Sequence, residues 1–451
     1  MKTKLSFKES LTVTSMLFGM FFGAGNIIFP VYLGQLAGRN VWPAIIGFCI
    51  TGVGFPLLAV AALGISKSNG LLDLSGRVGR KYGMFFTCLL YLTIGPFFAI
   101  PRCASTSFTV GIEALLPQGM SPRIPLAVFS LIFFAAVLWF SLRPSGILTW
   151  IGKFLNPVFL VFLGILLVTA LVLPMGHVKD VVPAENYTSG AFFNGFLEGY
   201  NTMDALAGLA FGIVVVNVIK NLGVKEPDSI AKNTVKSGIF SCLAMAVIYV
   251  ALTVVGTQSR GVYEMGANGG EVLANVAMHY FKIAGLVILS LMITFACLKT
   301  AVGLVTSCAE TFEDMFKKGP KYKFYAVLFC IISFIFANFG LSAIIAYAIP
   351  VLMFLYPLAI TLILLSLFGK FFGYDKKVFV SVTALTLAAA VFDLMKTLPE
   401  NIVSALRLDV PVGFASKILP FFDLGLGWIC PALAGLVIGL ALHFAFKPKT
   451  A

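Results

Sequence analysis

Charged side chains are scarce in this chain of 451 residues: Asp, Glu, Lys and Arg together make up 11% of it, and only three residues are histidine. Hydrophobic side chains make up 59%, and the mean hydropathy is +0.99. A chain with so little polar surface cannot cover a globule of this size in water. The composition therefore excludes a water-soluble enzyme and indicates a bilayer as the solvent.

Several motifs of other protein classes are missing as well. The eight cysteines all lie in apolar runs, which predicts free thiols packed as small hydrophobic groups, with no disulfide framework and no metal site. No GxxxxGK[ST] motif occurs, so any transport has to be driven by an ion gradient. There is no ring of polar residues for a channel pore and no catalytic constellation for an intramembrane enzyme. We therefore expect neither an enzyme nor a bound cofactor.

Twelve apolar runs have about the 20 residues that a membrane-spanning helix needs. We expect spans at 11–33, 42–65, 84–112, 124–142, 149–173, 191–219, 238–258, 279–308, 323–338, 341–368, 378–395 and 424–446. The first run resembles a signal peptide, but it is too long for one and carries Gly, Asn and Pro, so we expect it to be retained. The fold class expected is an all-α integral membrane protein.

The basic residues set the orientation. Placing both termini in the cytoplasm leaves eight of the 32 basic residues outside and two within spans, and the remainder falls on the inner side, as the positive-inside rule requires. The eight outer ones are Arg39, Arg123, Lys179, Arg260, Lys282, Lys396, Arg407 and Lys417. The net charge of +13 is thus explained by topology, and no nucleic-acid partner is expected.

The first span is interrupted by its own sequence. Gly19-Met-Phe-Phe-Gly-Ala-Gly-Asn-Ile-Ile-Phe-Pro30 places three glycines, an amide and a proline at mid-membrane depth. Each unpaired backbone group in hydrocarbon costs several kcal/mol, so a break there is expected to line a cavity or bind something. The alternative is close helix packing, because Gly19 and Gly23 form a GxxxG pair.

The sixth span repeats this anomaly in Gly199-Tyr-Asn-Thr-Met-Asp-Ala-Leu-Ala-Gly208. Spans one to five (1–173) and six to ten (174–368) begin alike but enter from opposite sides, and 369–451 adds two appended spans. Interrupted segments at matching places of two opposed halves point to a substrate site at the membrane midplane of a secondary transporter. Helix-end partial charges there suit a zwitterion.

Four motifs carry a family resemblance across the whole chain. Gly19 to Pro30, Gly95 to Phe108, Gly199 to Ala205 and Ala296 to Gly303 together resemble the bacterial branched-chain amino-acid carrier family. The resemblance implies uptake of leucine, isoleucine and valine by cation symport across the bacterial cytoplasmic membrane, on the leucine-transporter fold. A symporter of the same fold, sodium-coupled and acting on another small zwitterionic or neutral substrate, is the rival interpretation.

The resemblance also implies a site at the two breaks, with backbone amides around Ala24 and Gly25 meeting the substrate carboxylate. Phe21, Phe22 and Met203 could form an apolar wall for a branched side chain. Asp204 is a candidate even without the resemblance. A carboxylate at mid-membrane is costly, so such a residue is by default a hypothesis for a functional site. The expected substrate-binding residues are Phe22, Gly23, Ala24, Gly25, Asn26, Tyr200, Asn201, Thr202, Met203 and Asp204.

The coupling ion depends on one position. In sodium-coupled members of the fold, a carbonyl and two hydroxyls of span eight match Ala296, Lys299 and Thr300, beside the carbonyls of Gly19 and Phe22. Here an amine replaces the first hydroxyl. Because burial disfavours the charged form of a lysine, we expect Lys299 to lose and regain a proton, which favours proton over sodium coupling. Sodium coupling remains open if Lys299 points towards Asp204 or the interface.

Arg102 is the second basic residue inside a span. It could brace an external gate through Glu113 or Glu198, or it could extend its guanidinium to the outer interface.

Overall fold

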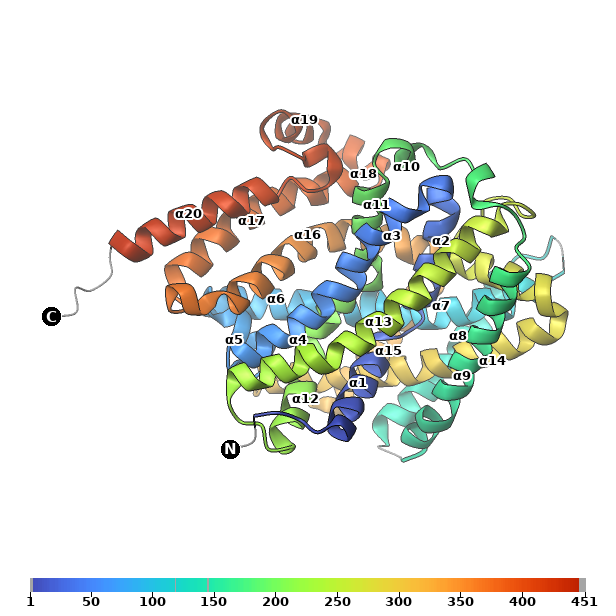
Figure 1. Ribbon diagram of the computed structural model, residues 1–451, viewed down its shortest axis with the longest axis horizontal. Helices are drawn as coiled ribbons and strands as arrows, with labels where there is room; N and C mark the ends of the chain where they lie inside the picture. Colours follow the sequence, from blue (N-terminus) through green and yellow to red (C-terminus); the bar gives the residue numbers. More distant parts are fainter. Residues whose placement is uncertain (1–2, 118, 144–145, 446–451) are drawn as a thin grey trace.

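The computed structural model describes residues 3–117, 119–143 and 146–445, without the side chains of 146–156. All regular elements in these ranges are helical (Figure 1), so the predicted all-α class is confirmed. Eight helical stretches are long and apolar enough to cross a bilayer, and three shorter apolar helices accompany them. The predicted cytoplasmic ends, 1–2 and 446–451, lie outside the described residues.

The helices follow the predicted runs closely at most places. The main ones are α1 (Phe7–Phe21), α2 (Gly25–Ala37), α3 (Val41–Cys49), α4 (Phe55–Ile65), α5 (Leu71–Gly76), α6 (Arg80–Leu92), α7 (Ala99–Gly111), α8 (Arg123–Leu142), α9 (Gly146–Val172), α11 (Ala191–Glu198), α12 (Asp204–Asn221), α13 (Pro227–Ser259), α14 (Gly269–Met315), α15 (Tyr322–Ala337), α16 (Leu341–Leu367), α17 (Lys376–Thr397) and α20 (Ile429–Ala445). Short helices, α10 (Glu185–Ser189), α18 (Glu400–Ala405) and α19 (Asp409–Ile418), occupy the segments expected outside the membrane. A short turn at 338–340 separates α15 from α16, near the boundary between the predicted spans 323–338 and 341–368.

Three predicted spans differ from the structure. The third is divided at Gly95, whose backbone (φ −98°, ψ −121°) is not helical, after a π-helical turn η3 (Thr93–Phe97) that contains Pro96. The seventh begins at Pro227, well before the predicted 238, because a largely polar stretch at 227–237, about three helical turns, extends it. The eighth is preceded by a further helix, joined to it at Lys282, where the backbone (φ 53°) is left-handed.

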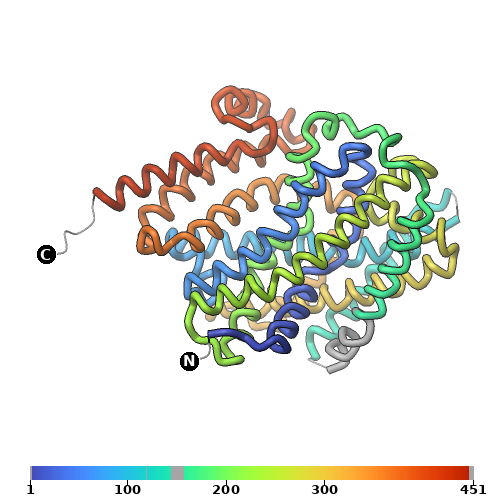
Figure 2. The backbone as a smooth tube through the Cα atoms, viewed as in Figure 1, coloured from blue at the N-terminus to red at the C-terminus, as the bar shows by residue number. Residues whose placement is uncertain are grey.

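Glycine brings α2 and α13 into direct backbone contact. A Cβ added at Gly34 would lie 1.9 Å from the carbonyl oxygen of Thr253, and one at Gly256 would lie 1.9 Å from that of Val31. Each helix thus offers a glycine to the other, the small-residue packing that membrane helices use. The tube of residues 227–259 runs beside that of residues 25–65 (Figure 2).

The two C-terminal long helices form a layer at one edge of the molecule. α17 packs between α16 and α20, and these three helices lie together beside the main bundle (Figure 1). α16 also contacts the 3-10 turn η6 (Gly199–Thr202). α16 therefore connects the appended layer with the second interrupted segment.

Candidate functional site

The first interruption falls at residues 22–24. α1 ends at Phe21, Phe22 is extended (φ −76°, ψ 100°), and α2 begins at Gly25. The Gly23 amide donates to Oδ1 of Asn26 at 2.9 Å, whereas the Ala24 amide donates no hydrogen bond to any described residue. The first turn of a helix leaves its amides without intrahelical partners and carries partial positive charge. The start of α2 therefore presents a donor to an anionic group.

The second interruption falls at Met203. α11 leads into η6, Met203 takes the left-handed conformation (φ 63°, ψ 11°), and α12 begins at Asp204. The left-handed region costs a residue with a side chain about 1–2 kcal/mol, so the surrounding contacts must hold it. Oγ1 of Thr202 accepts a hydrogen bond from the Asp204 amide at 3.3 Å, which caps the start of α12.

Asn26 and Asp204 join the two interruptions. Nδ2 of Asn26 donates to Oδ2 of Asp204 at 2.5 Å and to the Tyr249 hydroxyl at 2.5 Å. Asn26, Asp204 and Tyr249 are all buried, with 2%, 4% and 0% of their surfaces exposed. Two residues predicted for the site are thus in direct contact, and a third group, Tyr249 on α13, completes the cluster.

Arg102 of α7 also lies between the interruptions. Its Nη1 donates to the carbonyl oxygen of Asn201 at 2.6 Å, and its guanidinium lies 4.9 Å from the centre of the Phe29 ring. A Cβ at Gly25 would come within 2.9 Å of Nη2, so the glycine leaves room for the guanidinium. The arginine supplies a fixed positive charge near Asp204.

The gate predicted for Arg102 is not formed in this structure. Glu113 accepts a hydrogen bond from Thr109 at 2.7 Å, and Glu198 faces Asn201. Within the part of the chain that the structure describes, no ion pair joins Arg102 to either carboxylate. Arg102 is only 6% exposed, and its guanidinium is directed inward, where it donates to the carbonyl of Asn201 in η6.

Only two of the residues predicted for the cation site, Ala296 and Thr300, are joined by a hydrogen bond among the described residues. Oγ1 of Thr300 donates to the carbonyl of Ala296 at 3.0 Å, within α14. Lys299 is half-buried and makes no hydrogen bond or ion pair with the described residues. Gly19 is exposed, and α1 packs on α13 and α12. A cation held between the carbonyls of Gly19 and Phe22 and this face of α14 stays a prediction.

Two aromatic residues near the site were not predicted. The ring of Tyr356 stacks on that of Tyr200 at 3.9 Å with 10° between their planes, and Tyr249 receives the Asn26 hydrogen bond described above. Both lie inside predicted spans, where a tyrosine is usually a packing residue. A tyrosine in an apolar run carries no sequence signal that separates the two roles. Of the predicted apolar wall, Phe21 and Met203 are buried, whereas Phe22 is half-buried and stacks on Phe18 at 4.9 Å.

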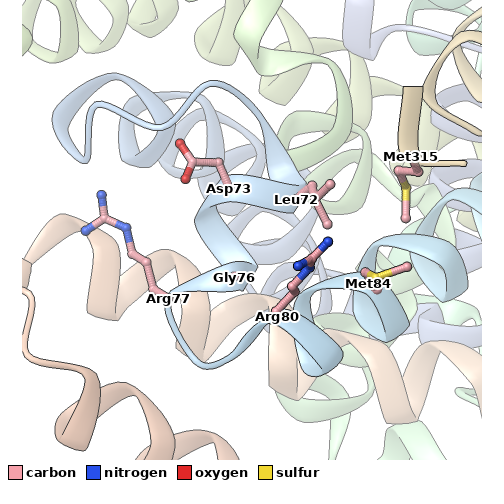
Figure 3. A pocket seen from close by; sticks show the side chains of 7 residues that line it. All are labelled: Leu72, Asp73, Gly76, Arg77, Arg80, Met84 and Met315. Carbon is pink, nitrogen blue, oxygen red and sulfur yellow. The ribbon is translucent and has the colours of Figure 1, made fainter. Parts of the chain in front are cut away.

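A surface pocket lies elsewhere, where α5 and α6 meet the end of α14 (Figure 3). It has a volume of about 380 Å³. Its lining residues are Leu72, Asp73, Gly76, Arg77, Arg80, Met84 and Met315. None of these is a predicted site residue, and Arg77 points away from Met84 and Met315 to donate to the carbonyl of Ser66.

Comparison with known proteins identifies the family. The family described as "Branched-chain amino acid transport protein" matches residues 6–446. The chain belongs to this family. A branched-chain amino acid permease BrnQ of Lactobacillus delbrueckii subsp. lactis is 53% identical over 451 residues, covering all of both chains. BrnQ of Bacillus subtilis (strain 168) is 41% identical, again over the full length of both. The family is one of transport proteins, not of enzymes.

Solved structures show the fold of this branched-chain amino acid transport family member. The inward-facing conformation of Mhp1 matches with a TM-score of 0.57 at 14% identity, over 97% of this chain and 91% of that one. MhsT in complex with L-phenylalanine matches with a TM-score of 0.56 at 14% identity, over 98% of both chains. Both have the leucine-transporter-like fold, so the expected fold is confirmed at that level.

Proposed function

We propose that this protein takes up leucine, isoleucine and valine by symport with a monovalent cation, with the substrate bound between the two interruptions. The hydrogen bond between Asn26 and Asp204 carries the proposal, because it places both broken segments at one buried point. The names of the two relatives described above, both branched-chain amino acid permeases that match over their full length, support the substrate class. Transport proceeds by alternating access, in which the site opens first to one side of the membrane and then to the other.

The two ends of an amino acid match the polar groups of this point. The substrate carboxylate is received by the free amide of Ala24 at the positive end of α2, with Arg102 as a nearby fixed cation. The ammonium is received by the Asp204 carboxylate. Phe22 and Met203 supply apolar surface for a branched side chain. A substrate that lacked either charge would leave one of these buried groups without a partner, which disfavours its binding.

The architecture that we infer has twelve spans, with inverted halves at 1–173 and 174–368 and two appended spans in 369–451. Both termini lie in the cytoplasm of a bacterial cell. Lys299 supports proton coupling, because it is an amine without a partner among the described side chains, at the place where sodium-coupled members of the fold have a hydroxyl. A half-buried amine there can lose and regain a proton.

Uptake of radiolabelled leucine into proteoliposomes tests the proposal. The pH gradient and the sodium gradient are imposed separately, and unlabelled isoleucine, valine or alanine is added as competitor. We expect accumulation under an inward proton gradient alone, with competition by isoleucine and valine well above that by alanine. Accumulation that follows sodium alone would overturn proton coupling. Equal competition by all three amino acids would overturn the substrate assignment.

A further inference from the structure

Asp393 is a second carboxyl buried in the membrane-spanning part of the protein, on the appended helix α17. It is 0% exposed, and neither of its oxygens has a hydrogen-bond partner among the described residues. Aspartate is almost never fully buried without a partner, and an ionised carboxylate in that state is far more costly than a neutral one. Burial without a partner therefore favours the neutral form of this carboxyl over the ionised one.

The surroundings of Asp393 contain two hydrogen-bond donors that are also unused. The hydroxyl of Tyr200 and the indole N–H of Trp428, which directly precedes α20, are buried and make no hydrogen bond with described residues. Both lie on elements that meet around α17: η6 packs on α16, α16 and α20 pack on α17, and the Tyr200 hydroxyl interacts electrostatically with the Asp393 carboxyl and faces the Trp428 indole. The cluster thus joins a residue of the second interruption to two elements outside the first ten predicted spans.

The charged and titratable groups around the cluster are few. On α17, Lys396 is the cation nearest in sequence, but it donates to the carbonyl of Phe422 at 3.0 Å and lies 3.7 Å from Asp423. From α16 comes Tyr356, stacked on Tyr200, and from η6 comes Tyr200 itself. Among the described residues, no ion pair therefore joins Asp393 to a cation, and the Lys396 ammonium acts on it only from a distance.

We propose that Asp393 is a proton-binding site, and that its ionisation recruits the Tyr200 hydroxyl and the Trp428 indole as donors to the carboxylate. The ligand is a proton because an indole N–H donates only and cannot ligate a cation. Within the described residues, no group of three or more His, Cys, Asp or Glu side chains could hold a metal ion. The site goes beyond the proposed uptake and does not depend on the identity of the substrate.

Binding and release of the proton change how α17 is held to the interrupted segment. With the proton bound, the three groups only pack together. With the proton released to water, the carboxylate accepts hydrogen bonds from η6 and from the start of α20. The stacked rings of Tyr200 and Tyr356 connect this cluster to the central site. The hydroxyl of Tyr356 has Thr202 and Asp204 as neighbours.

Tryptophan emission tests this site without any transport measurement. The chain has four tryptophans, so a variant with Trp42, Trp139 and Trp150 replaced by phenylalanine reports on Trp428 alone. We expect its emission to change as the pH is raised, in the absence of substrate, when the full chain is studied in detergent. Asp393→Asn in the same background should abolish the change.

Two further variants fix the interpretation. Tyr200→Phe removes one donor to the carboxylate, so the emission change should move to higher pH. Asp204→Asn alters the central site but leaves Asp393 intact, so the change should persist even if leucine binding is lost. Emission that does not respond to pH, or a response that survives in Asp393→Asn, would overturn the proposal. If Asp393→Asn does not fold, the shift in Tyr200→Phe decides it, and an unshifted response would overturn the proposal.

Discussion

Asn26 donates a 2.5 Å hydrogen bond from its Nδ2 to Oδ2 of Asp204, across 178 positions of sequence. The same side chain accepts from the Gly23 amide, so one amide group holds the first interruption in shape and attaches it to the second. An unpaired carboxylate at this depth would be costly. The contact between the two broken segments therefore also lowers the free-energy cost of burying Asp204.

Removal of the Asn26 amide should weaken substrate binding. Asn26→Ala leaves the Gly23 amide without its partner and leaves Oδ2 of Asp204 with only the 3.5 Å hydrogen bond from the Tyr249 hydroxyl. An unsatisfied group costs about 1–3 kcal/mol, so leucine affinity should fall by about 10- to 100-fold. The measurement is leucine binding to the purified protein in detergent. Asn40→Ala is the matched control, because Asn40 makes its hydrogen bonds to the carbonyls of Tyr187 and Thr188 in a predicted outer loop. Unchanged affinity in Asn26→Ala would contradict the proposed site.

Arg102 should be sensitive to replacement by lysine. Lysine keeps the charge, but it cannot stack a planar group on Phe29 while donating to the carbonyl of Asn201. We expect leucine uptake by Arg102→Lys to fall by at least about tenfold, or ~1.4 kcal/mol, whereas Glu113→Gln stays within about twofold of the parent. Initial uptake rates in vesicles measure both. Equal losses in the two variants would favour a gate through Glu113 after all.

Lys299 should matter for accumulation and much less for binding. Lys299→Met keeps an unbranched apolar side chain at this position and removes the amine that we propose to carry the coupling proton. We expect leucine binding within a few-fold of the parent and loss of uptake driven by a pH gradient. Lys179→Met, which removes an exposed lysine of a predicted outer segment, is the control and should transport normally. If Lys299→Met still accumulates leucine under a proton gradient, the amine is not the coupling group.

The link between α17 and α20 should weaken in strong acid. His443 contacts Asp375 at 2.8 Å, and this hydrogen bond, together with the Lys377 amide, lowers the pKa of Asp375. The folded protein therefore binds this proton less readily than the unfolded chain. The contribution to stability is present above the usual aspartate value of about 3.9 and is lost as the pH falls through the lower folded value.

Thermal unfolding in detergent measures this contribution. Asp375→Asn should lower the midpoint slightly, by about 1–2 °C, since partly exposed pairs contribute little. The difference from the parent should shrink as the pH falls below about 4, where the parent also carries the proton. A difference that grows in acid would show the opposite sign and contradict the assignment.

The sequence was sufficient to predict where the backbone is interrupted, but it was insufficient to predict which side chains meet there. Glycines, Asn26 and Asp204 inside apolar runs are anomalies that can be seen without a structure, and the chain is interrupted at both places. Tyr249 and Asp393 lie in runs that look like ordinary spans, so their roles depend on which faces meet in three dimensions. The inward turn of Arg102 was likewise hidden, because the carbonyl that it binds becomes free only when the η6 turn forms.

The reciprocal glycines of α2 and α13 have a mechanical consequence. With a carbonyl of each helix seated where a side chain of the other would stand, neither helix can slide or roll without a collision. Any rearrangement must therefore move the two helices as one rigid body, and Asn26 and Tyr249 move together with it. Spectroscopic labels placed one on each of these helices should keep a constant separation, whichever side of the membrane the protein faces.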